Sequence, residues 1–210
     1  MKVLIVEDHP IVRAGFRRLL GEDPTVEIVE AVTGRDGYRL FCEARPDLVL
    51  LDLNLPGLGG LEVLDRMLHH EPAARILVVS MHDDPVFASR ALQGGALGYV
   101  SKSSPPERLS EAVRRVAGGQ RYLDHEIAQS LALRSVNAEP GGDPLSPLSR
   151  RDLEILRLVG EGQSLAQIAH ALGLSYKTVA NNCTQIKTKL GLPRTADLVR
   201  FALNRGIAQS

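Results

Sequence analysis

The chain has 210 residues, of which 44% are hydrophobic and 24% charged, and its 25 Lys and Arg balance its 25 Asp and Glu. This composition is ordinary for a soluble globular protein, and the length suits two small domains. Two cysteines are too few for a disulfide framework, and no apolar run is long enough for a signal peptide or a membrane span. We therefore expect a cytoplasmic protein without a membrane partner.

The charge is unevenly distributed along the chain. Acidic residues outnumber basic ones in residues 1–117, whereas basic residues outnumber acidic ones in residues 149–210. This distribution is compatible with a metal or phosphate site in the first part and a nucleic-acid partner for the second.

Residues 1–117 alternate five times between short apolar runs and helical patterns. The apolar runs predict strands over residues 3–6, 26–32, 48–52, 76–79 and 97–101. The helical patterns predict helices over residues 10–20, 33–44, 60–69, 83–93 and 105–117. The alternation favours an α/β domain of flavodoxin-like fold, in which a doubly wound, five-stranded parallel sheet has the strand order 2-1-3-4-5 and helices on both faces.

The expected strands end in residues that carry a charge or a hydroxyl group. Glu7 and Asp8 follow the first strand, Asp52 ends the third, Ser80 the fourth and Lys102 the fifth. Because the carboxyl ends of parallel strands face the ligand crevice, these side chains should lie together. Close carboxylates repel one another unless a hard cation such as Mg²⁺ lies among them. These groups are what Asp52 needs to accept a phosphoryl group, although a surface ion pair of Lys102 and a helix-capping Ser80 are the ordinary alternative.

The segment after the first domain has the composition of a linker. Gly118 and Gly119 end the last helix, and residues 124–134 have apolar residues at helical spacing. Residues 136–147 are rich in Pro and Gly, contain further turn-forming polar residues, and predict a flexible tether. We therefore expect a first domain over residues 1–117, a linker with one helix over 118–147 and a second domain over 148–210 that reorients freely.

Four short helical patterns follow the tether and predict a small all-α domain. Ser164 and Gln167 form a capping-box pattern at the start of the second helix, and Gly173 ends that helix. The third helix, about residues 176–190, has an apolar stripe at Val179, Cys183, Ile186 and Leu190, and its other face is rich in amide and basic groups. This order of elements indicates helix-turn-helix DNA binding, with a plain helical bundle as the alternative.

Motifs in residues 6–10, 52–57, 60–62, 79–82 and 98–102 resemble the receiver domain of bacterial two-component response regulators, and the whole chain looks like the NarL/FixJ subgroup. The resemblance implies that Asp52 is the phosphoacceptor. It implies that Lys102 and Ser80 grip phosphoryl oxygens and that Tyr99 turns inward when Ser80 moves. The implied Mg²⁺ ligands are Asp8, Asp52, the backbone carbonyl of Asn54 and, mainly through water, Glu7. The chain departs from the common receiver pattern at two positions. Position 7 is Glu where Asp is commoner, and Ser103 stands where many receivers have a proline, so we expect no cis-proline after Lys102.

Motifs in residues 148–151, 162–164, 168–169, 174–175, 178–179 and 189–192 resemble the LuxR-type DNA-binding domain. The expected DNA-binding residues are Lys177, Thr178, Ala180, Asn181, Thr184, Lys187 and Lys189. Asn181 and Thr184 should face bases, and the lysines should lie nearer phosphates. A final helix over residues 195–204 should supply a dimer contact through Leu198, Phe201 or Ala202. Because relatives often have Lys and His in place of Ala180 and Asn182, their DNA sequence preference cannot be transferred.

The resemblance implies a phosphorylation-controlled transcription regulator, which is not an enzyme beyond slow autodephosphorylation. Its implied partners are a sensor histidine kinase, promoter DNA and, when phosphorylated, a second copy of the chain. A phosphatase of the haloacid-dehalogenase kind is an alternative, but Asn54 stands where those enzymes have a second Asp. A receiver that has lost phosphorylation is another, and the complete acidic set argues against it.

Overall fold

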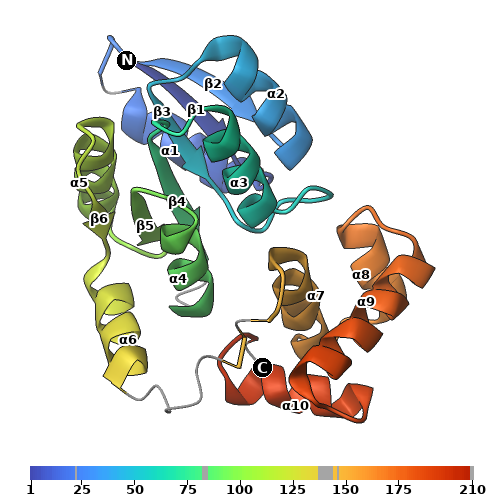
Figure 1. The fold of residues 1–210 in the computed structure, drawn as a ribbon. Coiled ribbons are helices and arrows are strands. Elements are labelled where there is room, and N and C mark those ends of the chain that lie inside the picture. The colour runs from blue at the N-terminus through green and yellow to red at the C-terminus, as the bar shows by residue number, and fades with distance from the viewer. Residues whose placement is uncertain (22, 82–84, 137–143, 146, 209–210) are drawn as a thin grey trace. The chain divides into compact units, whose positions relative to one another are not determined.

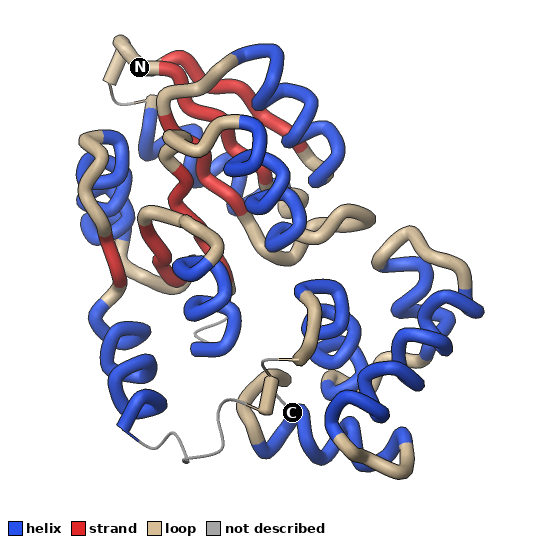
Figure 2. Tube along the Cα trace, viewed as in Figure 1, coloured by secondary structure: helices blue, strands red, loops and turns tan. Residues whose placement is uncertain are grey.

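The computed structural model describes residues 1–21, 23–81, 85–136, 144–145 and 147–208. It divides into two compact units, Met1–Ala132 and Leu133–Ser210, of which the first holds the sheet and the second only helices (Figure 2). The tether expected over residues 136–147 falls mostly outside the described residues, as do Asp83 and Asp84 at the expected start of the fourth helix. Among the described residues, the helices are all too short or too polar to cross a membrane.

The first unit is built on a parallel sheet. Its strands are β1 (Lys2–Val6), β2 (Glu27–Ala31), β3 (Leu48–Leu51), β4 (Ile76–Ser80), β5 (Gly98–Ser101) and β6 (Tyr122–Leu123), and their spatial order is β2-β1-β3-β4-β5-β6. The predicted fold class and the order of the first five strands are confirmed. The count of five strands is wrong, because the described sheet has a sixth strand of two residues, too short to show an apolar pattern of its own.

Helices cover both faces of this sheet (Figure 1). They are α1 (Pro10–Leu20), α2 (Gly34–Ala44), α3 (Gly60–His70), α4 (Pro85–Gln93) and α5 (Pro106–Ala117). Alternate residues of a strand point to opposite faces, so Ile5, Leu50 and Leu77 lie in register on one face. There they share a buried cluster with residues of α1 and α5, such as Phe16 and Val116.

Gly98 allows β6 to join the sheet beside β5. Gly98 pairs with Tyr122, and a Cβ atom at Gly98 would lie 3.0 Å from the Tyr122 carbonyl oxygen. The same atom would lie 2.8 Å from a methyl group of Leu77 and 2.9 Å from one of Val116. A larger residue would therefore push β6 or α5 away from the sheet. After β6, the chain continues directly into α6 (His125–Val136).

The second unit contains α7 (Arg150–Gly160), α8 (Leu165–Ala171), α9 (Tyr176–Leu190) and α10 (Thr195–Asn204). The capping box of Ser164 and Gln167 is confirmed, because each side chain bonds the other residue's backbone N–H. The apolar stripe of α9 is buried at Val179, Cys183 and Ile186 and half-buried at Leu190.

The structure corrects part of the expected dimer contact on α10. Leu198 and Ala202 are fully buried within the second unit, where α10 packs against α7. The Cβ atom of Ala202 lies so close to Gly160 that a side chain on that glycine would collide with it. Leu198 and Ala202 therefore face the unit's own core, and of the three expected residues Phe201 alone is partly exposed.

Candidate functional site

Asp52 lies directly after β3 and is only 1% exposed to solvent. Its backbone N–H donates to the Val6 carbonyl of the neighbouring strand at 3.0 Å. At the start of α3, the Gly60 N–H donates to the Leu53 carbonyl at 3.1 Å. A Cβ atom on Gly60 would lie 2.3 Å from the Asp52 carbonyl oxygen. A glycine at this position therefore lets α3 pack against the backbone that carries Asp52 and holds that backbone in place.

Lys102 reaches from the end of β5 to two carboxylates. Its Nζ atom lies 2.9 Å from Asp52 Oδ2 and 2.6 Å from Glu7 Oε2, and its side chain is 2% exposed. The Lys102 backbone N–H donates to the Ser80 carbonyl at 2.8 Å. Lys102 thus forms a buried bridge between the ends of β1 and β3, which differs from the ordinary alternative of a surface ion pair.

Negative charge exceeds positive charge in this cluster. Burial raises the pKa of Glu7, the nearby Asp52 charge raises it further, and Lys102 offsets part of the effect. Asp52 Oδ1 is buried and accepts no hydrogen bond from the described residues. A buried carboxylate oxygen without a donor is costly, so this oxygen is suited to a cation or to a reaction partner.

His9 and Arg13 belong to the site, although the sequence patterns did not single them out. One ligand atom from each of Glu7, Asp8, His9 and Asp52 lies within 4.8 Å of the others. His9 Nδ1 is 2.8 Å from Asp8 Oδ1 and 3.1 Å from Glu7 Oε1. Arg13 Nη1 donates to the Glu7 carbonyl at 2.9 Å and so holds the acidic loop. The position of His9 directly after Glu7 and Asp8 could have indicated that it belongs to the site. Arg13 contacts the Glu7 backbone carbonyl, and no sequence motif reveals such a contact.

Ser80 and Tyr99 are fully buried on neighbouring strands. Ser80 ends β4 opposite Ser101, and Tyr99 pairs with Val78. Tyr99 is already buried in this structure, and an inward turn of Tyr99 on movement of Ser80, which the resemblance implies, stays a prediction. Asn54, whose carbonyl is an expected metal ligand, lies half-buried in the loop after Leu53.

The second unit presents a polar helix face after a glycine turn. Gly173 in the turn has φ +62°, and the Ser175 side chain caps α9 by accepting the Thr178 N–H. Of the expected DNA-binding residues, Lys177, Thr178, Asn181, Thr184 and Lys189 are exposed, whereas Ala180 and Lys187 are half-buried. The Thr184 hydroxyl donates to the Ala180 carbonyl at 3.1 Å, which leaves its oxygen as an acceptor and its methyl group for contact.

Lys189 has a partner within the unit. Its Nζ atom donates to Asp152 Oδ2 at 2.6 Å, and the Asp152 side chain is 5% exposed. The same carboxylate oxygen accepts the Ser149 N–H at 2.9 Å at the start of α7. Lys189 therefore ties the end of α9 to the start of α7. This contact joins residues far apart in the sequence, and helical periodicity did not reveal it.

Lys189→Ala is expected to lower the unfolding free energy of the second unit by about 1 kcal/mol, because it removes a charged partner from a buried carboxylate. This loss corresponds to roughly 4–8 °C in the melting temperature of a domain of this size. Differential scanning calorimetry of the full chain measures it, with Lys177→Ala on the exposed start of α9 as the control. Equal melting curves for the two variants would show that the ion pair adds no stability.

Comparisons with known proteins agree with this two-part architecture. The response regulator receiver domain family matches residues 3–114, and the luxR family of bacterial regulatory proteins matches residues 146–202. The response regulator GacA of Pseudomonas aeruginosa is 35% identical over 211 residues, which cover 100% of this chain and 99% of GacA. The oxygen regulatory protein NreC of Staphylococcus epidermidis is 37% identical over 217 residues and covers 100% of both chains.

A solved structure of RcsB from Salmonella enterica, bound to a promoter in the presence of phosphomimetic BeF₃⁻, matches with a TM-score of 0.67 and 27% identity over 98% of each chain. The sheet with its acidic cluster and the helix-turn-helix unit define a two-domain DNA-binding regulator. The chain belongs to the LuxR family of two-component response regulators, which are transcriptional regulators.

Proposed function

We propose that Asp52 accepts a phosphoryl group from a sensor histidine kinase and that this modification controls the binding of promoter DNA by α9. The observation that carries the proposal is the buried Lys102 bridge to Asp52 and Glu7, with Asp52 Oδ1 left without a hydrogen bond from the described residues. A structural ion pair requires one carboxylate, whereas Lys102 contacts two. Burial raises the pKa of the second one, Glu7, and such perturbed groups are typical of functional sites.

In the proposed transfer, a carboxylate oxygen of Asp52 attacks phosphorus. A P–O bond forms while the P–N bond to the kinase histidine breaks, and the histidine nitrogen keeps the electron pair. Lys102 Nζ, 2.9 Å from Asp52 Oδ2, neutralises charge on the phosphoryl oxygens. The Ser80 hydroxyl group follows the phosphoryl group, and Tyr99 on the neighbouring strand senses its position.

The acidic cluster suits Mg²⁺, because its ligand atoms are mostly carboxylate oxygens and Asp52 Oδ1 is buried without a hydrogen bond from the described residues. Asp8, Asp52 and the Asn54 carbonyl would hold the ion, with Glu7 acting mainly through water. When bound, Mg²⁺ supplies positive charge to the phosphoryl oxygens. Arg13 keeps the Glu7 and Asp8 backbone in position for this role.

The protein acts as a regulator, and slow loss of the phosphoryl group to water is the one reaction that we assign to it. The acyl phosphate on Asp52 is open to attack by water, and no additional base is needed for a slow rate. The free thiols of Cys42 and Cys183 and a DNA partner are consistent with a cytoplasmic protein.

On DNA, α9 would lie in the major groove with Val179, Cys183 and Ile186 turned toward the unit's core. Asn181 and Thr184 would contact bases, and Lys177 and Lys187 would contact phosphates. Thr178 and Ala180 would lie close to the sugar-phosphate backbone of the DNA. Lys189 is expected to contribute less, because Asp152 already holds its ammonium group. Phosphorylation favours a homodimer, which places two such helices on one promoter.

Removal of Mg²⁺ tests the proposal directly. With acetyl phosphate and Mg²⁺, intact-mass spectrometry should show the gain of one phosphoryl group per chain. An excess of EDTA should reduce this gain to background, because the carboxylates then lack the cation that offsets their charge. Equal labelling in EDTA would contradict the assignment of the acidic cluster to Mg²⁺.

A further inference from the structure

A buried carboxylate lies between the phosphoacceptor site and α6. Asp124, the residue before α6, is 3% exposed. Its Oδ2 atom accepts a hydrogen bond from the Ser104 hydroxyl group. Its Oδ1 atom accepts from the His125 backbone N–H at 2.9 Å and from Arg108 Nη1 at 3.2 Å. One side chain thus joins the loop after Lys102, the start of α5 and the first turn of α6.

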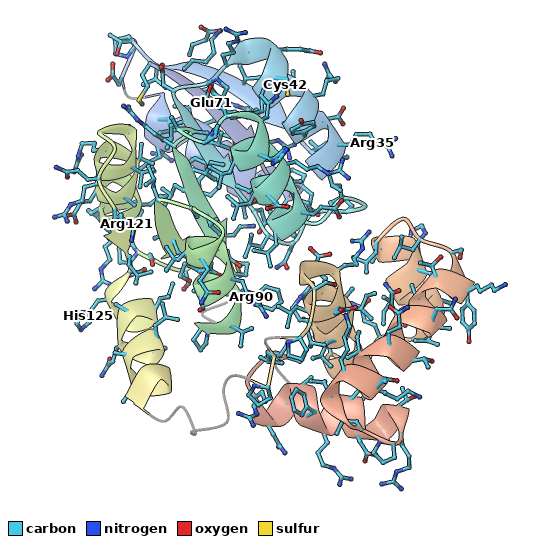
Figure 3. All side chains as sticks on the ribbon, viewed as in Figure 1. Arg35, Cys42, Glu71, Arg90, Arg121 and His125 are labelled. Carbon is cyan, nitrogen blue, oxygen red and sulfur yellow. The ribbon has the colours of Figure 1, made fainter. Side chains whose placement is uncertain are left out.

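The backbone of Asp124 continues the same connection. Its N–H donates to the Tyr99 carbonyl at 3.2 Å, and its carbonyl accepts the Ala128 N–H of α6 at 2.9 Å. Figure 3 labels Arg121 and His125 on either side of β6, and between them the chain passes from the sheet into α6. Asp124, the residue before α6, is therefore bonded to β5, the strand that carries the candidate switch residue Tyr99.

The loop between Lys102 and Ser104 is short and internally bonded. The Ser104 N–H donates to the Ser101 carbonyl at 3.1 Å, and the Ser101 and Ser103 hydroxyl groups share a hydrogen bond of 2.7 Å. Lys102 itself is fixed to Ser80 through its backbone N–H. A displacement of Lys102 toward Asp52 should therefore move Ser104, because only Ser103 lies between the two residues and the loop is internally bonded.

We propose that Ser104, Arg108 and the capping residue Asp124 form a latch, the Asp124 latch, that holds α6 on the first unit until Asp52 is phosphorylated. A phosphoryl group draws Lys102 toward itself, pulls Ser104 away from Asp124 and loosens the first turn of α6. The inference rests on the proposed role of Asp52 and deepens it, since it names the contact by which the site reaches the segment before the second unit.

Loosening is physically feasible because α6 has few other buried contacts. Of its side chains that the structure describes, Ile127 is the fully buried hydrophobic one, whereas Leu133 is 57% exposed. A short helix with a small apolar contact depends strongly on its N-cap. The capping carboxylate of Asp124 is therefore a control point for the docking of this helix.

Hydrogen–deuterium exchange of the full chain tests the latch. Without a phosphoryl mimic, Ser104→Ala and Asp124→Asn should each speed the exchange of the first α6 amides roughly tenfold to hundredfold, since each removes or weakens a hydrogen bond to a charged group. In the wild-type chain, beryllofluoride with Mg²⁺ should speed the same amides, and it should add little in the two variants. Ser130→Ala is the matched control, because the Ser130 hydroxyl group donates to the Glu126 carbonyl within α6 and takes no part in the Asp124 latch.

Labelling with acetyl phosphate in the same samples separates this inference from the proposed function. If Asp52 is labelled but α6 exchange stays unchanged in the wild type with beryllofluoride, the coupling is overturned and the phosphoacceptor role stands. If both variants exchange like the wild type without the mimic, the latch itself is overturned. If the wild-type chain is not labelled, both the proposed function and the coupling between Asp52 and α6 are contradicted. Fast exchange of the α6 amides in the variants without beryllofluoride would then still support the latch as a structural contact.

Discussion

Asp52→Asn is expected to abolish phosphorylation of the chain by acetyl phosphate and by any kinase that serves it. The amide is a poor nucleophile and cannot form an acyl phosphate, although its size and its place after β3 are retained. Labelling should fall to the background level, which intact-mass spectrometry measures. The loss should be complete because a single buried side chain carries the acceptor oxygen.

Asp65→Asn on the exposed face of α3 is the matched control, since it makes the same chemical change away from the acidic cluster. It should be labelled like the wild type. If Asp52→Asn is also labelled normally, a different residue is the acceptor, and the role assigned to the Lys102 bridge is wrong.

Asn181→Ala is expected to weaken binding to the preferred DNA site far more than binding to random DNA. Asn makes two hydrogen bonds to adenine in the major groove, and the loss of such a pair costs roughly 1–3 kcal/mol of discrimination. Fluorescence anisotropy with a site selected from a random library and with a scrambled duplex measures both affinities. Asn204→Ala, also an exposed Asn but at the end of α10, controls for a general effect of the substitution.

Lys177→Ala should behave differently from Asn181→Ala. A phosphate contact carries no sequence information, so both DNA affinities should fall by similar factors and the salt dependence should fall by about one ion. If Asn181→Ala also weakens the two duplexes equally, Asn181 is a backbone contact and direct base reading by this residue is refuted.

The architecture of the first unit could be predicted from the sequence because β1, β3 and β4 are mostly apolar, buried runs that end at polar residues and alternate with helical patterns. The end residues Glu7, Asp52 and Lys102 come together as the strand order requires. β6 could not be predicted, because two residues have no periodicity and depend on the small size of Gly98 beside them. Local sequence patterns predict helices and longer strands, whereas the pairing of a very short strand depends on residues that are distant in the sequence.

The finer contacts of the sites show the same limit. The sequence marks Asp124 as the start of a helix, but its bonds to Ser104 and Arg108 depend on the return of the chain after α5. Lys189 has the character of a DNA-binding residue, and only the packing of α9 on α7 reveals its pairing with Asp152. The resemblance also implied a dimer contact through Leu198 or Ala202, although the packing of α10 on α7 buries both residues.

The central claim is that the chemical state of Asp52 controls DNA binding. The most direct test measures the affinity for the selected DNA site, together with the mass by light scattering, with and without beryllofluoride and Mg²⁺. In the wild type, we expect the affinity to rise roughly 5- to 150-fold, the range of a typical coupling between two sites, with a shift toward the dimer mass. Asp52→Asn should show neither change. Unchanged affinity and mass in a wild-type chain that acetyl phosphate does label would contradict the account.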